Sequence, residues 1–499
     1  SNVRFGVNAG NSIASGGNQN TVVGDEAGTA ITTGDENVFV GFQSGDALVD
    51  GTFNVAMGSN SLTADTKGKK SVAIGTNALA TQNFTSLTDT FNTAVGHSAG
   101  TAVTTGIENT LIGGLAGDSL TDGAANVALG YNALSTDTGG NASIAIGKNA
   151  LSTQNLGIDT FNTAVGFAAG AAVTTGVQNT IMGGLAGDAL QDADENVVVG
   201  FGALTGDTLG SRTIAIGRGA LQAQNFTSAT NTYNTAVGYN AGASVSTGIQ
   251  NTFVGSLAGD GTDDGSYNVA VGLQALSANC GDSNTAIGES ALAVNTASSN
   301  TAVGKAALTS NTTGSGNVAT GFQAGLFATT SDNSTFVGFA AGQGITGAKL
   351  TGNYNTAVGK DAGLLLQGAA AENCIFGALA GDAITTGGEN CLFGMGAGGS
   401  IQTSIRNTFI GDDCGNTCTT GDSNVAMGHA AMGQGVTTGD FNVAIGFTAG
   451  ATLTSGTLNT VMGKNAGKSI NTGANNTFVG ALAGDATDDG LNNTAVGYG

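Results

Sequence analysis

The sequence predicts an all-β fold: a parallel β-solenoid of about 29 turns that occupies residues 1–499 as one continuous repeat array. Three observations support this. One short pattern recurs from end to end, most often at a step of about 17 residues. The chain has 86 glycines and no proline or tryptophan, a composition typical of many short strands joined by tight turns. The composition is also uniform, so nothing marks a domain boundary. Both ends fall inside a repeat, and we therefore expect the array to belong to a longer fibre chain.

The repeat is clearest where Asn92-Thr93-Ala94-Val95-Gly96 returns one step later as Asn109-Thr110-Leu111-Ile112-Gly113. With its glycine counted as position 0, the pattern occurs 29 times between Gly6 and Gly497, at a mean step of about 17.5 residues. One step, at about 3.3 Å for each residue, gives a contour of about 56 Å, enough for two short strands and two turns. Each repeat is therefore expected to form one turn of the solenoid, hereafter a rung, with equivalent residues stacked about 4.8 Å apart.

Positions −3 to −1 are predicted to form the strand of each rung. Position −3 is Thr, Val, Ile or Cys in every copy, and position −1 is apolar in every copy except Thr320. These two positions share one face, because side chains alternate along a strand. The glycine at position 0 ends the strand, and a small residue at position +3, usually Ala, fits the corner that follows.

Position −4 is Asn in 25 copies. Stacked amides can hydrogen-bond along the solenoid axis, so we expect a structural ladder of these side chains. The ladder includes Asn92, Asn109, Asn126, Asn162, Asn179, Asn196, Asn234 and Asn251.

Positions +4 and +7 vary together. Most rungs with Gly at +4 carry an aliphatic residue at +7, such as Ile31 or Leu120, whereas rungs with Leu at +4, such as Leu62, are polar at +7. Each rung thus supplies one bulky apolar group by one of two routes, as a close-packed interior requires.

Position −2 is apolar in every copy but the first, which has Arg4. A strand that is apolar on both faces is expected to be buried on both, one of them against a partner. We assign the partner to the −2 face, so Asp at Ala236, Ala270 and Ala286 is expected to break an assembly without disturbing each core.

Two peptides carry a family resemblance: KSVAIGTNAL from Lys70 to Leu79, and ASIAIGKNAL from Ala142 to Leu151. They resemble the head repeats of YadA-type trimeric autotransporter adhesins, and the Asn-Thr-Ala-Val-Gly-x-x-Ala-Gly copies are similar to repeats of phage and viral tail fibres. The resemblance implies a left-handed β-roll, a homotrimer, and an extracellular cell-surface appendage or virion fibre. It also implies a cell-surface or glycan receptor. The repeat step in this chain is longer than that of those heads.

The net charge and the hydropathy of the chain exclude several classes of binding partner. A net charge of −22 disfavours nucleic acid and anionic membranes, which select basic surfaces. No apolar run approaches the length of about 18 residues that a membrane-spanning helix needs, so no membrane insertion is expected. The remaining partners are the chain itself, as a homotrimer or an end-to-end filament, and the cell-surface or glycan receptor that the resemblance implies.

No catalytic group or cofactor is expected. The two histidines, His97 and His429, both lie at position +1 and belong to no nucleophile arrangement. The glycine pattern lacks the Gly-Lys-Ser/Thr of a phosphate loop.

Clustered aspartates at two turns make weak calcium candidates. The calcium-binding nonapeptide is absent, and solvated turns explain the carboxylates equally well. The candidates are Asp260, Asp263, Asp264, Asp485, Asp488 and Asp489.

Two cysteine pairs are notable. Cys374 and Cys391 both lie at position −3, one rung apart, where stacked buried thiols are favoured over a disulfide. Cys414 and Cys418 flank a corner, where a local disulfide and two free thiols are equally compatible with the spacing.

Four rungs, those ending at Gly96, Gly166, Gly238 and Gly359, contain insertions. They are expected to form loops on one edge, either for binding or as neutral length variation. Asn83 and Asn225 lie in Asn-Phe-Thr glycosylation signals within two of them.

These features favour a structural or adhesive extracellular fibre, with attachment through loops or a separate tip. An ice- or surface-binding solenoid is the alternative, opposed by the alternation of Thr with Val at position −3 and by the expected burial of that face. A polysaccharide-acting solenoid enzyme is the second alternative, for which no convergent acid cluster is visible.

Overall fold

The computed structural model describes residues 1–499 and contains strands and turns but no helix. The fold is a parallel β-solenoid, in which one three-residue strand per rung contributes to a sheet of 29 strands. The predicted fold class is therefore confirmed. The chain divides into two compact units, residues 1–250 and residues 251–499, and each is described by itself.

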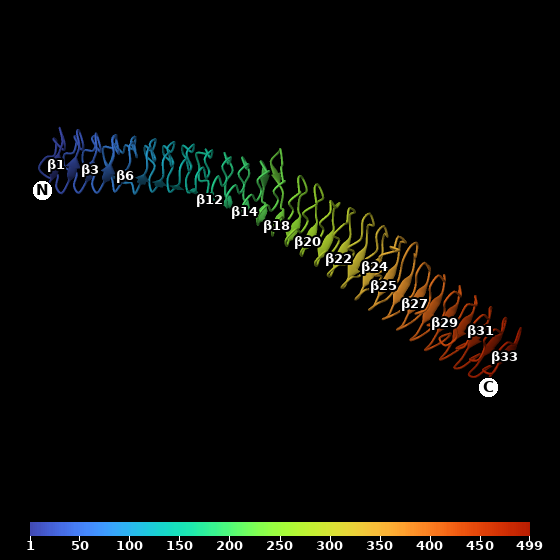
Figure 1. Ribbon diagram of the computed structural model, residues 1–499. Coiled ribbons are helices and arrows are strands. Elements are labelled where there is room, and N and C mark those ends of the chain that lie inside the picture. The colour runs from blue at the N-terminus through green and yellow to red at the C-terminus, as the bar shows by residue number, and fades with distance from the viewer. The chain divides into compact units, whose positions relative to one another are not determined.

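In the first unit the strands stack in parallel, one rung after the next (Figure 1). The register is the repeat register, so Thr93 pairs with Thr110 and Val95 with Ile112. The strands are β1 (Val3–Phe5), β2 (Thr21–Val23), β3 (Val38–Val40), β4 (Val55–Met57), β6 (Val72–Ile74), β8 (Thr93–Val95), β9 (Thr110–Ile112), β10 (Val127–Leu129), β11 (Ile144–Ile146), β12 (Thr163–Val165), β13 (Thr180–Met182), β14 (Val197–Val199), β16 (Ile214–Ile216) and β18 (Thr235–Val237).

The second unit repeats the arrangement, with Cys374 paired with Cys391 and Phe376 with Phe393. Its strands are β19 (Thr252–Val254), β20 (Val269–Val271), β21 (Thr285–Ile287), β22 (Thr301–Val303), β23 (Val318–Thr320), β24 (Thr335–Val337), β25 (Thr356–Val358), β26 (Cys374–Phe376), β27 (Cys391–Phe393), β28 (Thr408–Ile410), β29 (Val425–Met427), β30 (Val443–Ile445), β31 (Thr460–Met462), β32 (Thr477–Val479) and β33 (Thr494–Val496).

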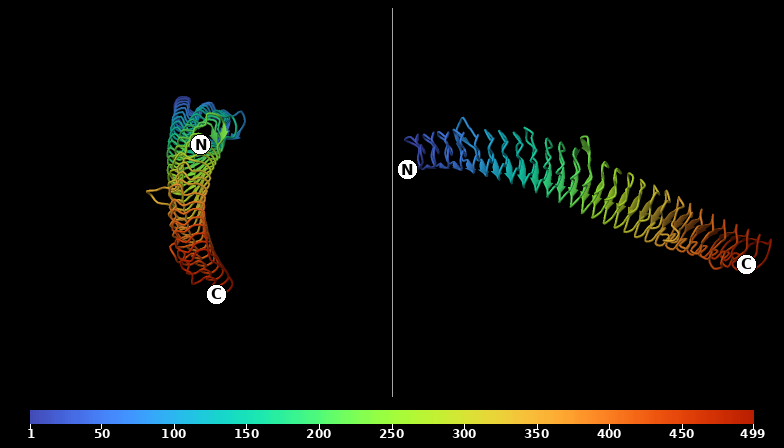
Figure 2. Two further views of the ribbon diagram at one scale, coloured as in Figure 1. Left: turned by 90° about the vertical axis from the view of Figure 1, so that its right-hand side faces the viewer. Right: turned by 45° about the horizontal axis from the view of Figure 1, so that its top comes forward.

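Insertions add short strands and loops at the rung edge. β5 (Gly68–Lys69) pairs with β7 (Thr88–Asp89), and β15 (Gly210–Ser211) pairs with β17 (Thr230–Asn231). The insertion containing β17 is the green loop that stands above β18 in Figure 1. In the second unit, the orange loop near residue 350 stands out from the coil in Figure 2. The predicted loops are therefore present.

The interior of each rung is built from positions −2 and +3. Every −2 side chain from β2 to β31 is at most 3 % exposed, including Ala94, Leu111 and Phe253, and the small residues at +3 are buried beside them. The assignment of the −2 face to a partner was therefore wrong: Ala236, Ala270 and Ala286 are fully buried inside their own rungs. Asp at these positions would place a charge in the core, and unfolding is expected instead of dissociation.

The two routes for filling the interior are both present. Ile31 and Leu120 at +7, and Leu62 and Leu134 at +4, are fully buried. Gly at +4 is required by the first route, because a Cβ on Gly28 would lie 2.7 Å from Ile31 Cδ1. The covariation of +4 and +7 therefore reflects volume compensation in one shared core.

The glycine at position 0 is fixed by the next rung. Gly113 has φ +135°, and a Cβ there would lie 2.4 Å from the carbonyl oxygen of Gly130. Only glycine combines this backbone conformation with so close an approach of the next strand end.

The asparagines at −4 form a hydrogen-bonded series inside the rungs, and the eight predicted members are all buried. Asn109 Oδ1 accepts the backbone N–H of Asn126 at 3.0 Å, and Asn109 Nδ2 donates to the Gly123 carbonyl at 2.8 Å. The Asn109 amide therefore bonds to two backbone groups, the N–H of Asn126 and the turn carbonyl of Gly123, and so ties its rung to the next. Some neighbouring amides also bond directly, as Asn196 Nδ2 does to Asn179 Oδ1 at 3.1 Å.

Polar residues at +7 of some Leu-containing rungs are buried, which the sequence did not predict. Asp65 accepts backbone N–H bonds from Gly68 at 2.9 Å and Phe84 at 3.2 Å, and its second oxygen accepts Gln82 Nε2 at 2.6 Å. Gln82 in turn accepts from Asn92 at 2.9 Å. Burial raises the pKa of Asp65, and these hydrogen bonds oppose the rise. The same Asp–Gln contact joins Asp207 to Gln224.

Candidate functional site

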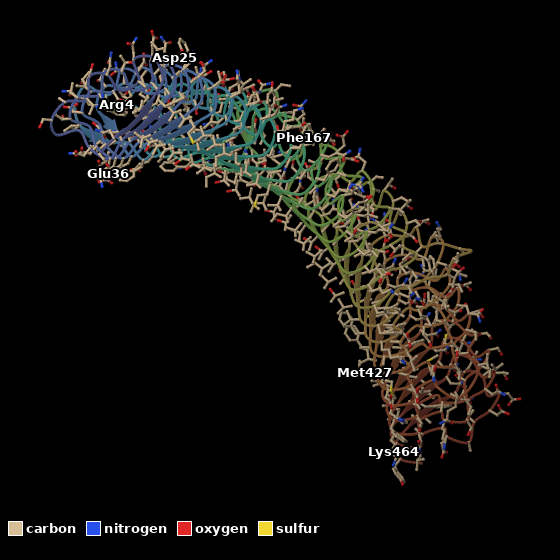
Figure 3. All side chains as sticks on the ribbon, turned by 60° about the vertical axis from the view of Figure 1, so that its left-hand side comes forward. Arg4, Asp25, Glu36, Phe167, Met427 and Lys464 are labelled. Atoms are coloured by element: carbon tan, nitrogen blue, oxygen red, sulfur yellow. The ribbon has the colours of Figure 1, made fainter.

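The outward face of the main sheet is the most extensive candidate surface in each unit. Side chains at −3 and −1 point away from the rung interior because the intervening −2 side chain points into it. In the first unit Leu129 and Met182 are 42 % and 44 % exposed, and in the second unit Met427 is 42 % exposed. Figure 3 shows Met427 projecting from the outside of the coil.

This outward face is mostly apolar and β-branched. Its −1 column holds Val, Ile, Leu, Met or Phe in all copies except Thr320, and its −3 column holds Thr, Val, Ile or Cys. The columns are in register, as the stacked rings of Phe376 and Phe393 show with centroids 4.8 Å apart. No charged side chain occupies either column.

Two further columns border the face. Position −5 carries aromatic or charged residues in many rungs, and Phe91, Phe161 and Tyr233 there are about half exposed. Position +1 carries the other aromatic column, with Phe167 54 % exposed on the outside of the coil (Figure 3). Large side chains thus border the sheet face on both edges in these rungs.

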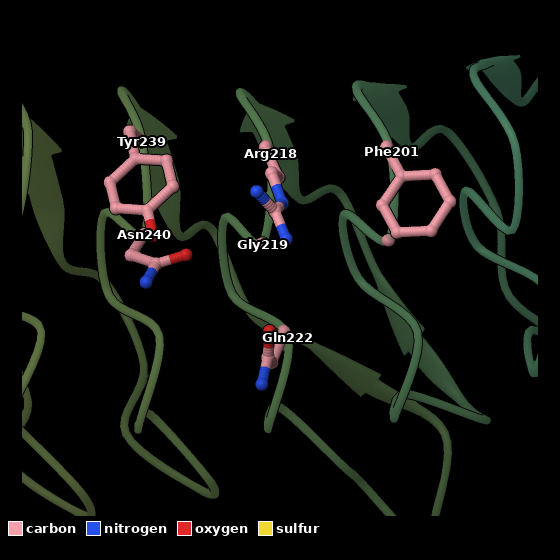
Figure 4. A pocket seen from close by; sticks show the side chains of 7 residues that line it. Phe201, Arg218, Gly219, Gln222, Tyr239 and Asn240 are labelled. Atoms are coloured by element: carbon pink, nitrogen blue, oxygen red, sulfur yellow. The ribbon is translucent and has the colours of Figure 1, made fainter.

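A hollow of about 190 Å³ lies in the +1 column of the first unit. Figure 4 shows Phe201, Arg218 and Tyr239 side by side on three successive rungs, with both rings seen face-on. The amides of Gln222 and Asn240 complete the lining. The structure therefore brings two aromatic faces, one cation and two amides to a single exposed site.

Glycines at +2 create this hollow. Gly202 and Gly219 follow Phe201 and Arg218, whereas the rungs on either side carry Leu185 and Asn240 at +2. A Cβ on Gly219 would lie 2.4 Å from Asn240 Oδ1, so glycine is needed for that amide to reach the site.

Arg218 differs from the other arginine of this rung. Arg212, at position −5, is 3.1 Å from the Glu195 carboxylate and lies over the Tyr233 ring. Hydrogen bonding to Glu195 and Tyr233 raises the pKa of the Arg212 guanidinium. Arg218 is exposed and makes no ion pair with the chain, so its charge remains available to a ligand.

The structure assembles no catalytic group around the two histidines. His97 is exposed, and His429 is half exposed, with Nε2 3.7 Å from Asp412 Oδ2 and its ring stacked on Phe447. That the chain is not an enzyme remains an expectation.

The calcium candidates do not converge. No group of three or more His, Cys, Asp or Glu side chains is arranged to hold a metal ion. Asp263, Asp264, Asp488 and Asp489 lie on turns near the surface. Asp260 lies partly buried, and desolvation raises the pKa of its carboxyl group.

All five cysteines are free thiols, so the bridge considered between Cys414 and Cys418 is not formed. These two side chains are buried at +3 and +7, where they fill the interior as Ala and aliphatic residues do in other rungs. Burial raises the pKa of each to about 12. Cys374 and Cys391 pair in register as predicted, but on the outward face and only partly buried.

Comparison with known protein families and with curated protein sequences finds no match. The chain contains no helix of the length and hydropathy needed to cross a membrane. The outward sheet face and the hollow at Arg218 are therefore the features that bear on function.

Sequence reasoning missed both principal surfaces. The outward face was assigned to the wrong position, although the polar exceptions Thr320 and the −3 threonines marked the solvent side. The hollow had one available signal: aromatic residues at +1 in alternate rungs, flanked by glycines at +2.

Proposed function

We propose that this protein is the repeat region of a structural and adhesive fibre, in which copies of the chain associate through the outward sheet face. The observation that carries the proposal is an uncharged column of Val, Ile, Leu, Met and Phe at −1 that is partly exposed in the single chain, with Leu129, Met182 and Met427 at 42–44 %. A contiguous apolar stripe of this kind marks an interaction surface.

A second copy is the occupant that matches the surface best. The face repeats with the period of the chain, so an identical parallel copy presents an equally regular face. Association around a symmetry axis would bury the −3 and −1 columns of each copy together. The trimer order implied by the YadA-type resemblance is compatible with such burial, and an extracellular location fits the same role.

The test places charges on the face of the first unit. Lys at Ile112, Ile146 and Met182 should lower the mass of the particle measured by light scattering, because like charges cannot be buried together. The matched control places Lys at Thr105, Ala223 and Ala229, which are exposed away from the face. Its particle mass should equal that of the unmodified chain. Equal masses for both variants and the unmodified chain, with folds intact by circular dichroism, would overturn the proposal.

Ice binding is the second candidate, and one observation favours it. The −3 threonines lie on the outward face beside −1 aliphatics, in a regular parallel sheet. The argument that this face is buried within the chain therefore no longer applies. Thermal hysteresis that disappears when Thr93, Thr110, Thr163 and Thr180 are replaced by Lys would support ice binding; its absence in the unmodified chain would exclude this candidate.

A further inference from the structure

The +1 column of the first unit has a two-rung period beyond the basic repeat. Its aromatic members Tyr131, Phe167, Phe201 and Tyr239 are each separated by one rung whose +1 residue is Lys148, Gly184 or Arg218. The corresponding strands pair successively from β10 to β18, so the column is continuous in this unit. Two rungs of a parallel stack span about 9.6 Å.

The aromatic rings present their faces outward. Phe201 and Tyr239 are 57 % and 49 % exposed and are seen face-on in Figure 4. The Phe201 ring also extends toward the preceding rung, where its Cδ2 lies 3.5 Å from the position of a Cβ on Gly184. The small residue in the intervening rung therefore leaves room for a flat ring.

A row of flat aromatic faces at this spacing suits one ligand geometry. In an extended β-1,4-linked polysaccharide, alternate sugars present the same face, at a repeat close to the length of two rungs. Sugar rings stack on aromatic faces through their C–H groups, while amides such as Gln222 and Asn240 suit sugar hydroxyls.

The position of Arg218 indicates that the ligand carries a negative charge. Its guanidinium lies between the rings of Phe201 and Tyr239, lines the hollow and has no carboxylate partner in the chain. A guanidinium binds a carboxylate with two parallel hydrogen bonds, which are stronger than hydrogen bonds to a neutral hydroxyl. The net charge of −22 repels anions from the chain as a whole, so an anionic ligand needs local positive charge, which Lys148 and Arg218 supply within this column.

We infer that the +1 column from Tyr131 to Tyr239 binds an extended, carboxylated β-1,4-linked saccharide, with Arg218 holding a carboxylate in the hollow. This inference deepens the adhesive part of the proposed function and is independent of self-association through the −3 and −1 columns. A flat chain would lie along the column, one aromatic contact for every second sugar.

The experiment is calorimetric titration of the full chain with three hexasaccharides. Oligomannuronate is β-1,4-linked and carboxylated, cellohexaose is β-1,4-linked and neutral, and maltohexaose is α-1,4-linked and curved. Oligomannuronate is expected to bind most tightly and maltohexaose not at all. Arg218→Met should weaken oligomannuronate binding about tenfold or more while leaving cellohexaose unchanged. Tyr239→Ala should weaken both.

The matched controls are Arg212→Met and Tyr233→Ala, which remove the same residue types from the −5 column. Neither control should change the affinity for any sugar. Particle mass is measured in parallel: unchanged mass in Tyr239→Ala separates sugar binding from self-association.

Three results would overturn the inference: no binding of any hexasaccharide, equal affinity of Arg218→Met and the unmodified chain for oligomannuronate, or a fall in particle mass in Tyr239→Ala. The last result would place the aromatic column between copies of the chain. The proposed self-association would survive the first two results, so the two proposals can fail separately.

Discussion

The interior amide series predicts a defined loss of stability when one member is removed. In Asn109→Ala, the Asn126 backbone N–H loses its acceptor at 3.0 Å and the Gly123 carbonyl loses its donor at 2.8 Å. Asn109 is fully buried, so water does not replace the side chain at either group. Each unsatisfied buried group costs about 1–3 kcal/mol, and the expected loss for the two groups is therefore about 2–6 kcal/mol. Urea unfolding followed by circular dichroism measures it.

The control is Asn493→Ala. Asn493 is exposed, and the Asn476 Oδ1 that accepts its Nδ2 also accepts its backbone N–H at 3.0 Å, so its replacement should change stability by about 0.5 kcal/mol or less. Hydrogen exchange at the amide of Asn126 should also accelerate in Asn109→Ala, because that N–H is no longer bonded. A loss below about 0.5 kcal/mol for Asn109→Ala would show that the series does not hold the rungs together.

Three other changes test the interior. Gly113→Ala should lower the free energy of unfolding by about 2 kcal/mol or more, since its Cβ would meet the Gly130 carbonyl in a left-handed conformation; an unchanged urea midpoint would contradict this. Gln82→Leu removes the hydrogen bond to buried Asp65 and should raise the pKa of that carboxyl further, costing about 2 kcal/mol at pH 7. A raised carboxyl pKa favours the protonated folded state, so this loss should shrink as the pH falls toward 3.8, the ordinary value for an aspartate; a pH-independent loss would refute it. Burial also raises the pKa of Asp118, whose Oδ1 is buried and has no hydrogen-bond partner, so Asp118→Asn should be more stable than the unmodified chain at pH 7 and equal to it below about pH 4.

The architecture could be predicted because each rung imposes the same constraints. A constant repeat step, a strand of β-branched residues and a glycine at its end leave few alternatives to a stack of parallel strands. The covariation of +4 and +7 also identified interior side chains correctly, since Ile31 and Leu62 fill the core by different routes. These features are local and repeat in every turn.

Hydropathy could not show which face of the strand points into the interior, because both faces are apolar. The interior face is set by the curvature of the backbone at the position 0 glycine and at the +3 corner, and alternation alone does not reveal curvature. The rare polar residues in the two columns were the signal that distinguishes the outward face from the interior face. Thr320 interrupts the −1 column, while the −2 column tolerates no polar residue beyond Arg4 in the first rung.

The buried Asp–Gln contacts and the hollow depend on neighbours from different rungs. Asp65 is satisfied by Gln82 of the next rung, so a polar residue at +7 did not by itself indicate whether that position is buried. The hollow at Arg218 arises where two successive rungs both have glycine at +2, namely Gly202 and Gly219. These contacts between residues of different rungs are revealed by the three-dimensional stacking and not by the sequence of one rung.

The measurement that tests the central claim most directly is the mass of the unmodified full chain in solution, by sedimentation equilibrium across a range of concentrations. If the outward −3 and −1 face joins copies of the chain, the mass will be a multiple of the single-chain mass at micromolar concentration. A trimer is the multiple expected from the resemblance to YadA-type heads. A single-chain mass at every concentration, with the solenoid folded, would contradict the account.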